Sequence, residues 1–253
     1  MDYLYHYTNI NSLAMILSNR CIRLNSLKNM DDAEEIITAN SKFLGKYCMV
    51  SSWTEIEEES VPFWGLYTKN MSGVRIKMQK NPFKIYELRL SYYKNGKKFQ
   101  SYCPESILNE NSVYLYPSLP FLRKVEYTDN TDLLYPRIFD YIKKKDNGNY
   151  DLSGTPININ KYKRTCWSFQ QEWRYGLLFF PHTKDGQLKL KLEANADDMP
   201  FWYCDLEITE EAFNDIEVML GPKMTIGDKK IVSCLIDKYC PTATIVESRL
   251  MIN

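Results

Sequence analysis

The sequence predicts an α+β fold in a single domain covering residues 1–253, and three observations support it. Segments with the alternating apolar pattern of strands outnumber those with helical periodicity, and they occur in clusters rather than in regular strand–helix–strand alternation. No internal repeat, low-complexity linker or abrupt change of composition divides the chain. The apolar fraction of 44% and the aromatic fraction of 14% allow a sizeable core.

The first part of the chain contains helical and strand signals in turn. Residues 8–17 carry apolar side chains on one helical face behind polar residues that can cap a helix. Residues 60–67 predict a short helix with Pro62 in its first turn. The acidic residues of 29–35 suit the N-terminus of a helix. Apolar runs or period-two alternation predict strands at 21–24, 47–53, 74–79 and 86–90.

The later part of the chain is predicted by the same criteria. Asn95-Gly96 indicates a hairpin turn. Residues 132–145 have helical periodicity and three lysines at the C-terminal end, and residues 146–149 end that helix. Paired strands are expected across Asp185-Gly186, at 172–180 and 187–193. Further strands are expected at 201–207, 217–220 and 243–247, with helices at 209–214 and 228–239.

Charge and cysteine content exclude several classes of protein. The 32 basic residues balance the 32 acidic ones, so no overall field attracts nucleic acid or anionic lipid. The N-terminal sequence lacks the pattern of a secretory signal, and no apolar run is long enough to span a membrane, so we expect a cytoplasmic protein without a membrane partner. Seven cysteines without a Cys-x-x-Cys pair, and only two histidines, predict neither a disulfide framework nor a metal site.

The first candidate site surrounds His6. The run Tyr5-His6-Tyr7-Thr8 places an imidazole, two phenols and a hydroxyl just before a predicted helix N-terminus. Such a position is suited to holding a ribose or a phosphate group. The alternative is a histidine that makes only a structural hydrogen bond.

The second candidate site lies in residues 166–174. If a strand includes 170–174, then Gln170, Glu172 and Arg174 share one face of it. One interpretation is an exposed face with a weak salt bridge. The other is a site in which Gln170 and Glu172 bind a substrate together.

Three weaker signals accompany these sites. The hydroxyls of Ser51 and Ser52, beside Trp53 at a strand end, can support a neighbouring carboxylate. Trp64 and Tyr67 share a helical face, and they either belong to the core or stack on a flat cationic ring. A Cys166 nucleophile with His182 as its base is also conceivable, although the spacing does not favour it.

The order of motifs resembles a widespread bacterial family known only as domain of unknown function family 2971. The matching segments are 4–8, 29–34, 50–53, 63–67, 73–74, 167–174 and 218–223, and they span nearly the whole chain. Where that family usually has Glu-x-Glu, this chain has Gln170-Gln171-Glu172. Any role that requires the charge of the first acid is therefore left to Glu172.

A more remote resemblance is to the ADP-ribosyltransferases. It implies a split or strongly curved, mostly antiparallel sheet with flanking helices and a cleft that binds NAD. By this resemblance His6 would hold the ribose, Ser51 or Ser52 would support the acid, Tyr67 would stack on nicotinamide, and Arg23 and Arg174 would contact phosphate. The expected catalytic residues are Glu172 and His6, and the expected binding residues are His6, Tyr7, Thr8, Arg23, Ser51, Ser52, Trp53, Trp64, Tyr67, Gln170 and Arg174.

The function implied is ADP-ribose transfer from NAD to a protein or nucleic-acid acceptor, or NAD hydrolysis, in a toxin or a phage-defence effector. Breaking the nicotinamide–ribose bond builds positive charge on the sugar, which a fixed carboxylate stabilises. The alternative is a non-catalytic module that binds a nucleotide, a nucleic acid or a protein in the same cleft. A basic groove at Lys161, Lys163 and Arg164 would favour nucleic acid.

Overall fold

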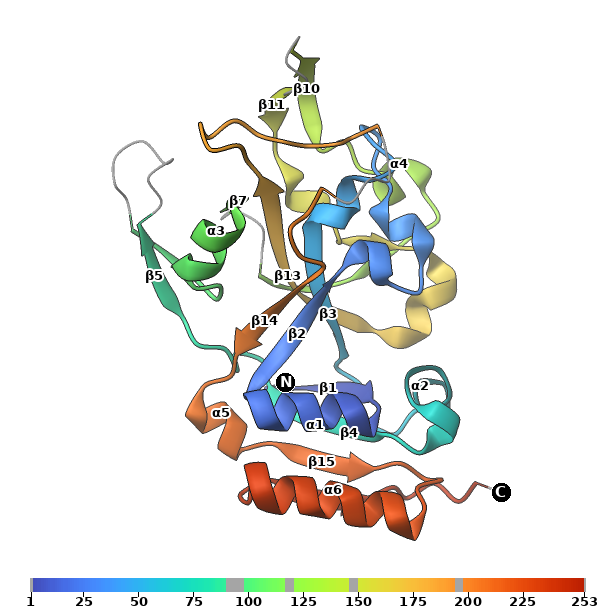
Figure 1. The fold of residues 1–253 in the computed structure, drawn as a ribbon. Helices are drawn as coiled ribbons and strands as arrows, with labels where there is room; N and C mark the ends of the chain where they lie inside the picture. The colour runs from blue at the N-terminus through green and yellow to red at the C-terminus, as the bar shows by residue number, and fades with distance from the viewer. Residues whose placement is uncertain (1, 90–97, 117–120, 146–149, 194–197, 253) are drawn as a thin grey trace.

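The computed structural model describes residues 2–89, 98–116, 121–145, 150–193 and 198–252 (Figure 1). Its main sheet has ten strands and is mostly antiparallel, and helices flank it. The strands of this sheet are β1 (Tyr3–Thr8), β2 (Cys21–Ser26), β3 (Cys48–Thr54), β4 (Val74–Gln79), β7 (Val113–Leu115), β8 (Leu122–Lys124), β13 (Glu172–Pro181), β14 (Tyr203–Glu207), β15 (Glu217–Leu220) and β16 (Thr244–Glu247).

The remaining elements are small sheets and helices. The two-stranded sheets pair β5 (Tyr86–Arg89) with β6 (Lys98–Ser101), β9 (Glu126–Tyr127) with β12 (Tyr162–Lys163), and β10 (Phe139–Lys144) with β11 (Tyr150–Gly154). The helices are α1 (Ile10–Asn19), α2 (Val61–Tyr67), α3 (Glu105–Asn111), α4 (Thr131–Leu134), α5 (Glu210–Asn214) and α6 (Ile226–Tyr239). Short 3₁₀ helices are η1 (Leu27–Asn29), η2 (Ala33–Ile36), η3 (Leu44–Tyr47), η4 (Lys69–Met71), η5 (Pro156–Asn158) and η6 (Thr165–Gln170).

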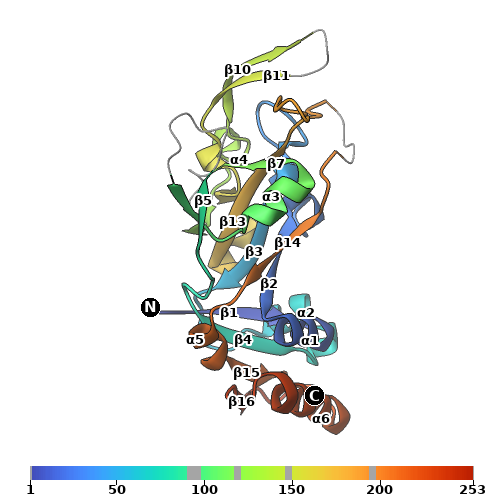
Figure 2. The ribbon, with the colours of Figure 1, turned by 60° about the vertical axis from the view of Figure 1, so that its left-hand side comes forward.

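The main sheet consists of two blocks that share little hydrogen bonding. The lower block contains β1, β4, β15 and β16, and the upper block contains β14, β2, β3, β13, β7 and β8. The residue pair Tyr5↔Thr54, between β1 and β3, joins the two blocks. Within the blocks, β1 pairs with β4 along its whole length and β3 pairs with β13 along its whole length. Figures 1 and 2 both show the strands of the lower block running across the steep strands of the upper block.

The helices of the lower block begin at side-chain caps that the sequence provides. The Asn9 side chain accepts a hydrogen bond from the backbone N–H of Ser12 at 2.8 Å and so caps α1. The side chains of Thr225 and Asp228 form a capping box at α6. These helices bury apolar faces, with Leu13 and Leu17 of α1 in the main core.

Gly73 lets β4 begin very close to the end of β1. A Cβ atom at this position would lie 2.2 Å from the backbone oxygen of Thr8 and 2.6 Å from Cβ of Thr68. The backbone of Gly221 lies beside it, with its N–H donating to the Gly73 oxygen at 2.9 Å. The close approach of these backbones fixes the C-terminal end of β1 beside α2.

The predicted α+β class with a mostly antiparallel sheet is confirmed, and most predicted elements are present within a few residues. The helix predicted at 132–145 is wrong: α4 ends at Leu134 and β10 follows. Pro136 stands between them, and proline has no N–H to continue a helix. The hairpin turn predicted at Asn95-Gly96 and the helix end at 146–149 lie outside the described residues.

The strand predicted at 187–193 is also wrong. Only Leu188 makes an isolated bridge, to His182, and the rest of the segment is irregular. Leu190 and Leu192 are nevertheless buried in the main core. The alternation of leucines with polar residues therefore reflects the burial of one side of the segment, although the segment is not a strand. In the part of the chain that the structure describes, no helix is long and apolar enough to span a membrane.

Candidate functional site

A cavity of about 530 Å³ lies where the two sheet blocks diverge, which is within the usual range for ligand pockets. Its walls come from β1, α1, β2, β3 and α2, from the segment before η2, and from the chain around η6 and the start of β13. Eleven of the twelve residues expected at the site line it: His6, Tyr7, Thr8, Arg23, Ser51, Ser52, Trp53, Tyr67, Gln170, Glu172 and Arg174.

His6 is fixed in one tautomer at the divergence of β1 and β3. Its Nδ1 lies 2.9 Å from the backbone oxygen of Ser52. A carbonyl oxygen can only accept, so Nδ1 carries the proton. Burial lowers the pKa of His6 from its ordinary value, although this hydrogen bond opposes the shift. The imidazole is therefore neutral near pH 7, and Nε2 is left as a hydrogen-bond acceptor.

Glu172 is a buried carboxylate, with 3% of its surface exposed. Arg174 donates from Nε to Oε1 at 2.6 Å and from Nη2 to Oε2 at 3.0 Å, and Nζ of Lys163 lies 3.3 Å from Oε2. The Ser52 side chain helps to lower the pKa of this carboxylate. Burial alone would raise the pKa of Glu172, but the charges of Arg174 and Lys163 outweigh it and hold the value at about 2.

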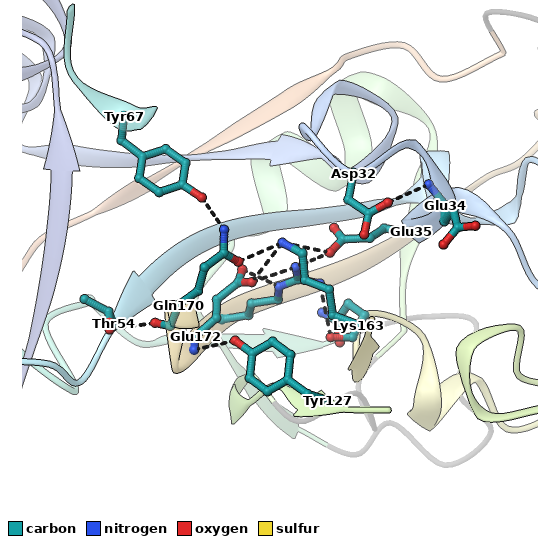
Figure 3. A network of polar contacts seen from close by, with 11 residues as sticks. Asp32, Glu34, Glu35, Thr54, Tyr67, Tyr127, Lys163, Gln170 and Glu172 are labelled. Atoms are coloured by element: carbon teal, nitrogen blue, oxygen red, sulfur yellow. Dashed lines mark hydrogen bonds and ion pairs between the residues drawn. The ribbon is translucent and has the colours of Figure 1, made fainter. Parts of the chain in front are cut away.

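Glu35 completes a network of two carboxylates and two cations. Its Oε1 accepts from Nη2 of Arg174 at 2.5 Å and lies 3.3 Å from Nζ of Lys163. Figure 3 shows Glu35, Glu172 and Lys163 converging on one point. All four side chains are at least nine-tenths buried, so their charges interact with little screening by solvent.

Gln170 holds this network against α2. Its backbone oxygen accepts from Thr54 Oγ1 at 2.8 Å, its Oε1 accepts from Lys163 at 2.9 Å, and its Nε2 donates to the Tyr67 hydroxyl (Figure 3). The strand predicted at 172–180 begins at Glu172, so the condition of a strand that includes 170 is not met: Gln170 ends η6 and Gln171 has a left-handed backbone. Gln170 thus reaches the network from outside the strand.

Ser52 shares a face of the sheet with Glu172, and Ser51 does not. The register of β3 with β13 pairs Ser52 with Arg174 and Thr54 with Glu172, so these four side chains share one face. Ser51 lies on the other face, where its Oγ accepts from the indole nitrogen of Trp53 at 3.0 Å. Of the two serines expected to support the acid, only Ser52 lies on the same sheet face as Glu172.

Two more of the predicted binding residues are engaged elsewhere on the cavity wall. The Tyr7 hydroxyl accepts from the backbone N–H of Ser60 at 3.2 Å. Arg23 makes a bidentate pair with Asp205, both contacts at 2.7 Å, and 41% of the Arg23 side chain is exposed. Because that pair is exposed, Arg23 can exchange its partner for a ligand anion at little cost.

The prediction that Trp64 binds the ligand is wrong. The side chain is fully buried, its ring packs on Tyr7 with centroids 4.8 Å apart, and its indole N–H donates to Glu59. Trp64 is therefore a core residue, which is the first of the two roles that its helical spacing allows. Tyr67, on the same helix, does line the cavity, and burial, followed by the nearby charge of Glu172, raises the pKa of Tyr67.

The sequence also allows an exposed salt bridge at Glu172, a Cys166–His182 pair and a basic groove at 161–164. Glu172 is buried, so the exposed salt bridge is wrong. His182 stacks on Tyr114 and bonds to Thr183, while Cys166 is exposed. The three basic residues expected to form a groove face carboxylates instead: Lys161 pairs with Glu126, Lys163 with Glu35 and Glu172, and Arg164 with Glu34.

Sequence reasoning missed Glu35 and Lys163 as site residues. In the sequence Glu35 is one of several acids that suit a helix N-terminus, and Lys163 belongs to a predicted basic groove. A signal was present, since a strand that carries both Glu172 and Arg174 into the core needs further charged partners. Nothing in the spacing says which of the 64 charged residues supply them.

The described residues contain no group of three or more histidine, cysteine, aspartate or glutamate side chains placed to hold a metal ion. The donors that converge in the cavity are instead suited to an organic ligand with hydroxyl and amide groups. Comparisons of the chain with protein-family models, curated proteins and solved structures give no match, so its function has to be inferred from the geometry of this cavity.

Proposed function

We propose that this chain binds NAD in the cavity and breaks the bond between nicotinamide and ribose, transferring ADP-ribose to an acceptor or to water. One observation carries the proposal. Ser52 shares a sheet face with the ionised carboxylate of Glu172, and its backbone oxygen accepts a hydrogen bond from the neutral imidazole of His6. Both side chains line the same cavity, which has the volume of a ligand pocket.

The proposed chemistry uses the fixed charge of Glu172. When the nicotinamide nitrogen leaves with the bonding electrons, positive charge develops on the ribose ring. A carboxylate with a pKa of about 2 is ionised at neutral pH, so it is available to stabilise that charge. It does not serve as a general acid, because its proton is lost far below the working pH.

The remaining cavity residues fit supporting roles. Nε2 of His6 accepts a hydrogen bond from a ribose hydroxyl, and the ring of Tyr67 lies against the nicotinamide. Arg23 contacts a phosphate at the outer part of the cavity, where its exposed pair with Asp205 gives way. The buried Arg174 is already engaged with two carboxylates, so in this proposal it positions Glu172 rather than binding phosphate.

A second candidate is a binding module without catalysis, and one observation favours it. Both oxygens of Glu172 are occupied, Oε1 by Arg174 and Oε2 by Arg174 and Lys163. A carboxylate held in this way contributes rigidity to a pocket that only binds a nucleotide. In that case substitution of Glu172 alters affinity and there is no turnover to lose.

The experiment compares Glu172→Gln with the wild type and with Glu126→Gln, an exposed carboxylate paired with Lys161 outside the cavity. NAD affinity is measured by calorimetry and nicotinamide release by chromatography. We expect Glu172→Gln to bind NAD and to release nicotinamide about 10²–10³-fold more slowly, a loss typical of a missing electrostatic stabiliser. Glu126→Gln should match the wild type.

Two outcomes contradict the proposal. If wild-type protein neither binds nor cleaves NAD, alone or with candidate acceptors, the assignment of NAD is wrong. If NAD binds, no nicotinamide is released, and Glu172→Gln changes only the affinity, the chain is the binding module.

A further inference from the structure

Glu35 has one carboxylate oxygen that the network leaves open. Its Oε1 is bonded to Arg174 and Lys163, but Oε2 is buried and has no hydrogen-bond partner among the described residues. The side chain is 3% exposed and lines the cavity. Leaving a buried carboxylate oxygen without a partner is unfavourable, so the folded chain keeps an acceptor at this point that a ligand donor can satisfy.

The two carboxylates of the site therefore differ in what they can do. Both oxygens of Glu172 are bonded to Arg174, and Oε2 also faces Lys163. Glu35 lines the same cavity, and its buried Oε2 has lone pairs that no described residue uses. Nη2 of Arg174 contacts both carboxylates, so the open oxygen of Glu35 lies close to the charge of Glu172.

We propose that Glu35, through Oε2, is the catalytic residue that accepts the proton of the attacking nucleophile, and that this nucleophile is water or a hydroxyl group. The inference rests on the proposed cleavage of NAD. The nucleophile oxygen forms a bond to C1 of the ribose, and the C1–nitrogen bond to nicotinamide breaks. Its electron pair leaves with the nicotinamide nitrogen, and the proton of the nucleophile passes to Oε2 of Glu35.

The charge of the site favours a neutral O–H acceptor over a cationic one. Lys163 and Arg174 balance Glu35 and Glu172, and Arg23 balances Asp205. Asp31, another acid that lines the cavity, is exposed to solvent. A guanidinium or ammonium acceptor beside Glu35 would also meet the two buried cations, whereas a hydroxyl donates to Oε2 without adding charge.

Gln170 does not compete for this role. Its amide oxygen accepts from Lys163 and its amide nitrogen donates to Tyr67. The residue two positions before Glu172 therefore holds the network together, while the open acceptor comes from a segment far away in the sequence.

The test uses Glu35→Gln, with Glu34→Gln as the matched control, because Glu34 is the neighbouring carboxylate and pairs with Arg164 outside the cavity. Glutamine keeps an oxygen that accepts from Arg174 but cannot take up a proton. We expect Glu35→Gln to bind NAD within about threefold of the wild type and to release nicotinamide about 10²–10⁴-fold more slowly. Sodium azide, a nucleophile without a proton to lose, should restore release in Glu35→Gln and not in Glu172→Gln.

Acceptor class is tested with methanol and agmatine. The wild type should form a methyl adduct of ADP-ribose from methanol and none from agmatine. An agmatine adduct would overturn the hydroxyl assignment.

If Glu35→Gln does not fold, judged by circular dichroism, the wild type supplies the test. Its hydrolysis of NAD should be slower in D₂O than in H₂O, and that difference should vanish when azide is the nucleophile. If the reaction with azide is slowed in D₂O as much as hydrolysis is, the assignment of Glu35 is overturned.

The outcomes separate this inference from the proposed function. A wild type that does not release nicotinamide refutes both. A wild type that releases nicotinamide, with Glu35→Gln equally fast in the absence of azide, refutes only the role of Glu35.

Discussion

The guanidinium of Arg174 donates two hydrogen bonds to the carboxylate of Glu172, which lies two residues earlier on the same face of β13. Both side chains are almost completely buried. The pair is therefore a fixed part of the cavity wall. Breaking a buried pair on one side is expected to be far more disruptive than breaking an exposed one, because it leaves a charge without a partner.

Arg174→Met should lower the free energy of unfolding by about 3–5 kcal/mol, because it leaves the carboxylates of Glu172 and Glu35 with Lys163 alone. Arg23→Met is the matched control, since Arg23 pairs with Asp205 at the exposed side of the cavity, and its loss should stay below about 1 kcal/mol. Urea unfolding measures both. Equal losses in the two variants would contradict the view that burial sets the strength of these pairs.

The stability of the protein should depend on the ionisation of Glu172 in acid. Its pKa is lowered in the folded state from 4.5 to about 2, so this contribution is complete above about pH 5 and is lost as the pH falls toward 2. The wild type should therefore lose on the order of 3 kcal/mol from this group over that interval. Unfolding measured at several pH values should show a shallower decline in Glu172→Gln. Identical slopes would show that the pKa of Glu172 is not lowered by folding.

His6 should remain neutral to a lower pH than an ordinary histidine. Burial lowers its pKa from 6.5, and the Ser52 carbonyl fixes the proton on Nδ1. Because the folded state resists protonation, this group reduces stability as the pH falls below 6.5. Nitrogen-15 NMR of the imidazole should show a protonated Nδ1 and a bare Nε2 at pH 7. A titration midpoint at or above 6.5, or the opposite tautomer, would contradict the site geometry.

Gly73→Ala should destabilise the protein by about 1–3 kcal/mol, since the new methyl group would lie 2.2 Å from the backbone oxygen of Thr8. Gly65→Ala is the control. Its Cβ would meet only Cε of Met71, at 3.7 Å, and alanine favours the α2 helix by about 0.5–1 kcal/mol. Thermal unfolding should therefore move in opposite directions in the two variants. A tolerated Gly73→Ala would show that β1 and β4 can separate there.

The sheet could largely be predicted from the sequence, because its central strands have strong local signals. β3 and β13 are dense apolar runs, and α1 and α6 carry caps and one apolar face. The helix predicted at 132–145 is wrong because Pro136 interrupts its apolar periodicity. The strand predicted at 187–193 is wrong for another reason. Alternating leucines indicate only that one side of the segment is buried, whereas a strand also needs a neighbouring strand to bond its backbone.

The sequence predicts many of the residues of the candidate site, but it does not predict the ion pairs that join them. His6, Ser52 and Glu172 each stood out by residue type at the end of a predicted element, and they line one cavity. Glu35 and Lys163 did not, because their importance comes from Arg174, and the segments that carry these three residues are brought together only by the fold. The sequence places Trp64 and Tyr67 on one helix face. Only the packing of Trp64 against Tyr7 in the fold shows that Trp64 is the core residue of the two.

The lower and upper blocks of the sheet meet through the ladder pair Tyr5↔Thr54, and residues of both blocks line the cavity. A molecule bound there would cross-link parts of the sheet that share almost no backbone hydrogen bonds of their own. Amide hydrogen exchange should therefore slow in β1 and β3 when the cavity fills. A ligand present at a hundred times its Kd adds about 2.7 kcal/mol to the stability of the whole chain, and its effect on exchange would be felt first at this junction.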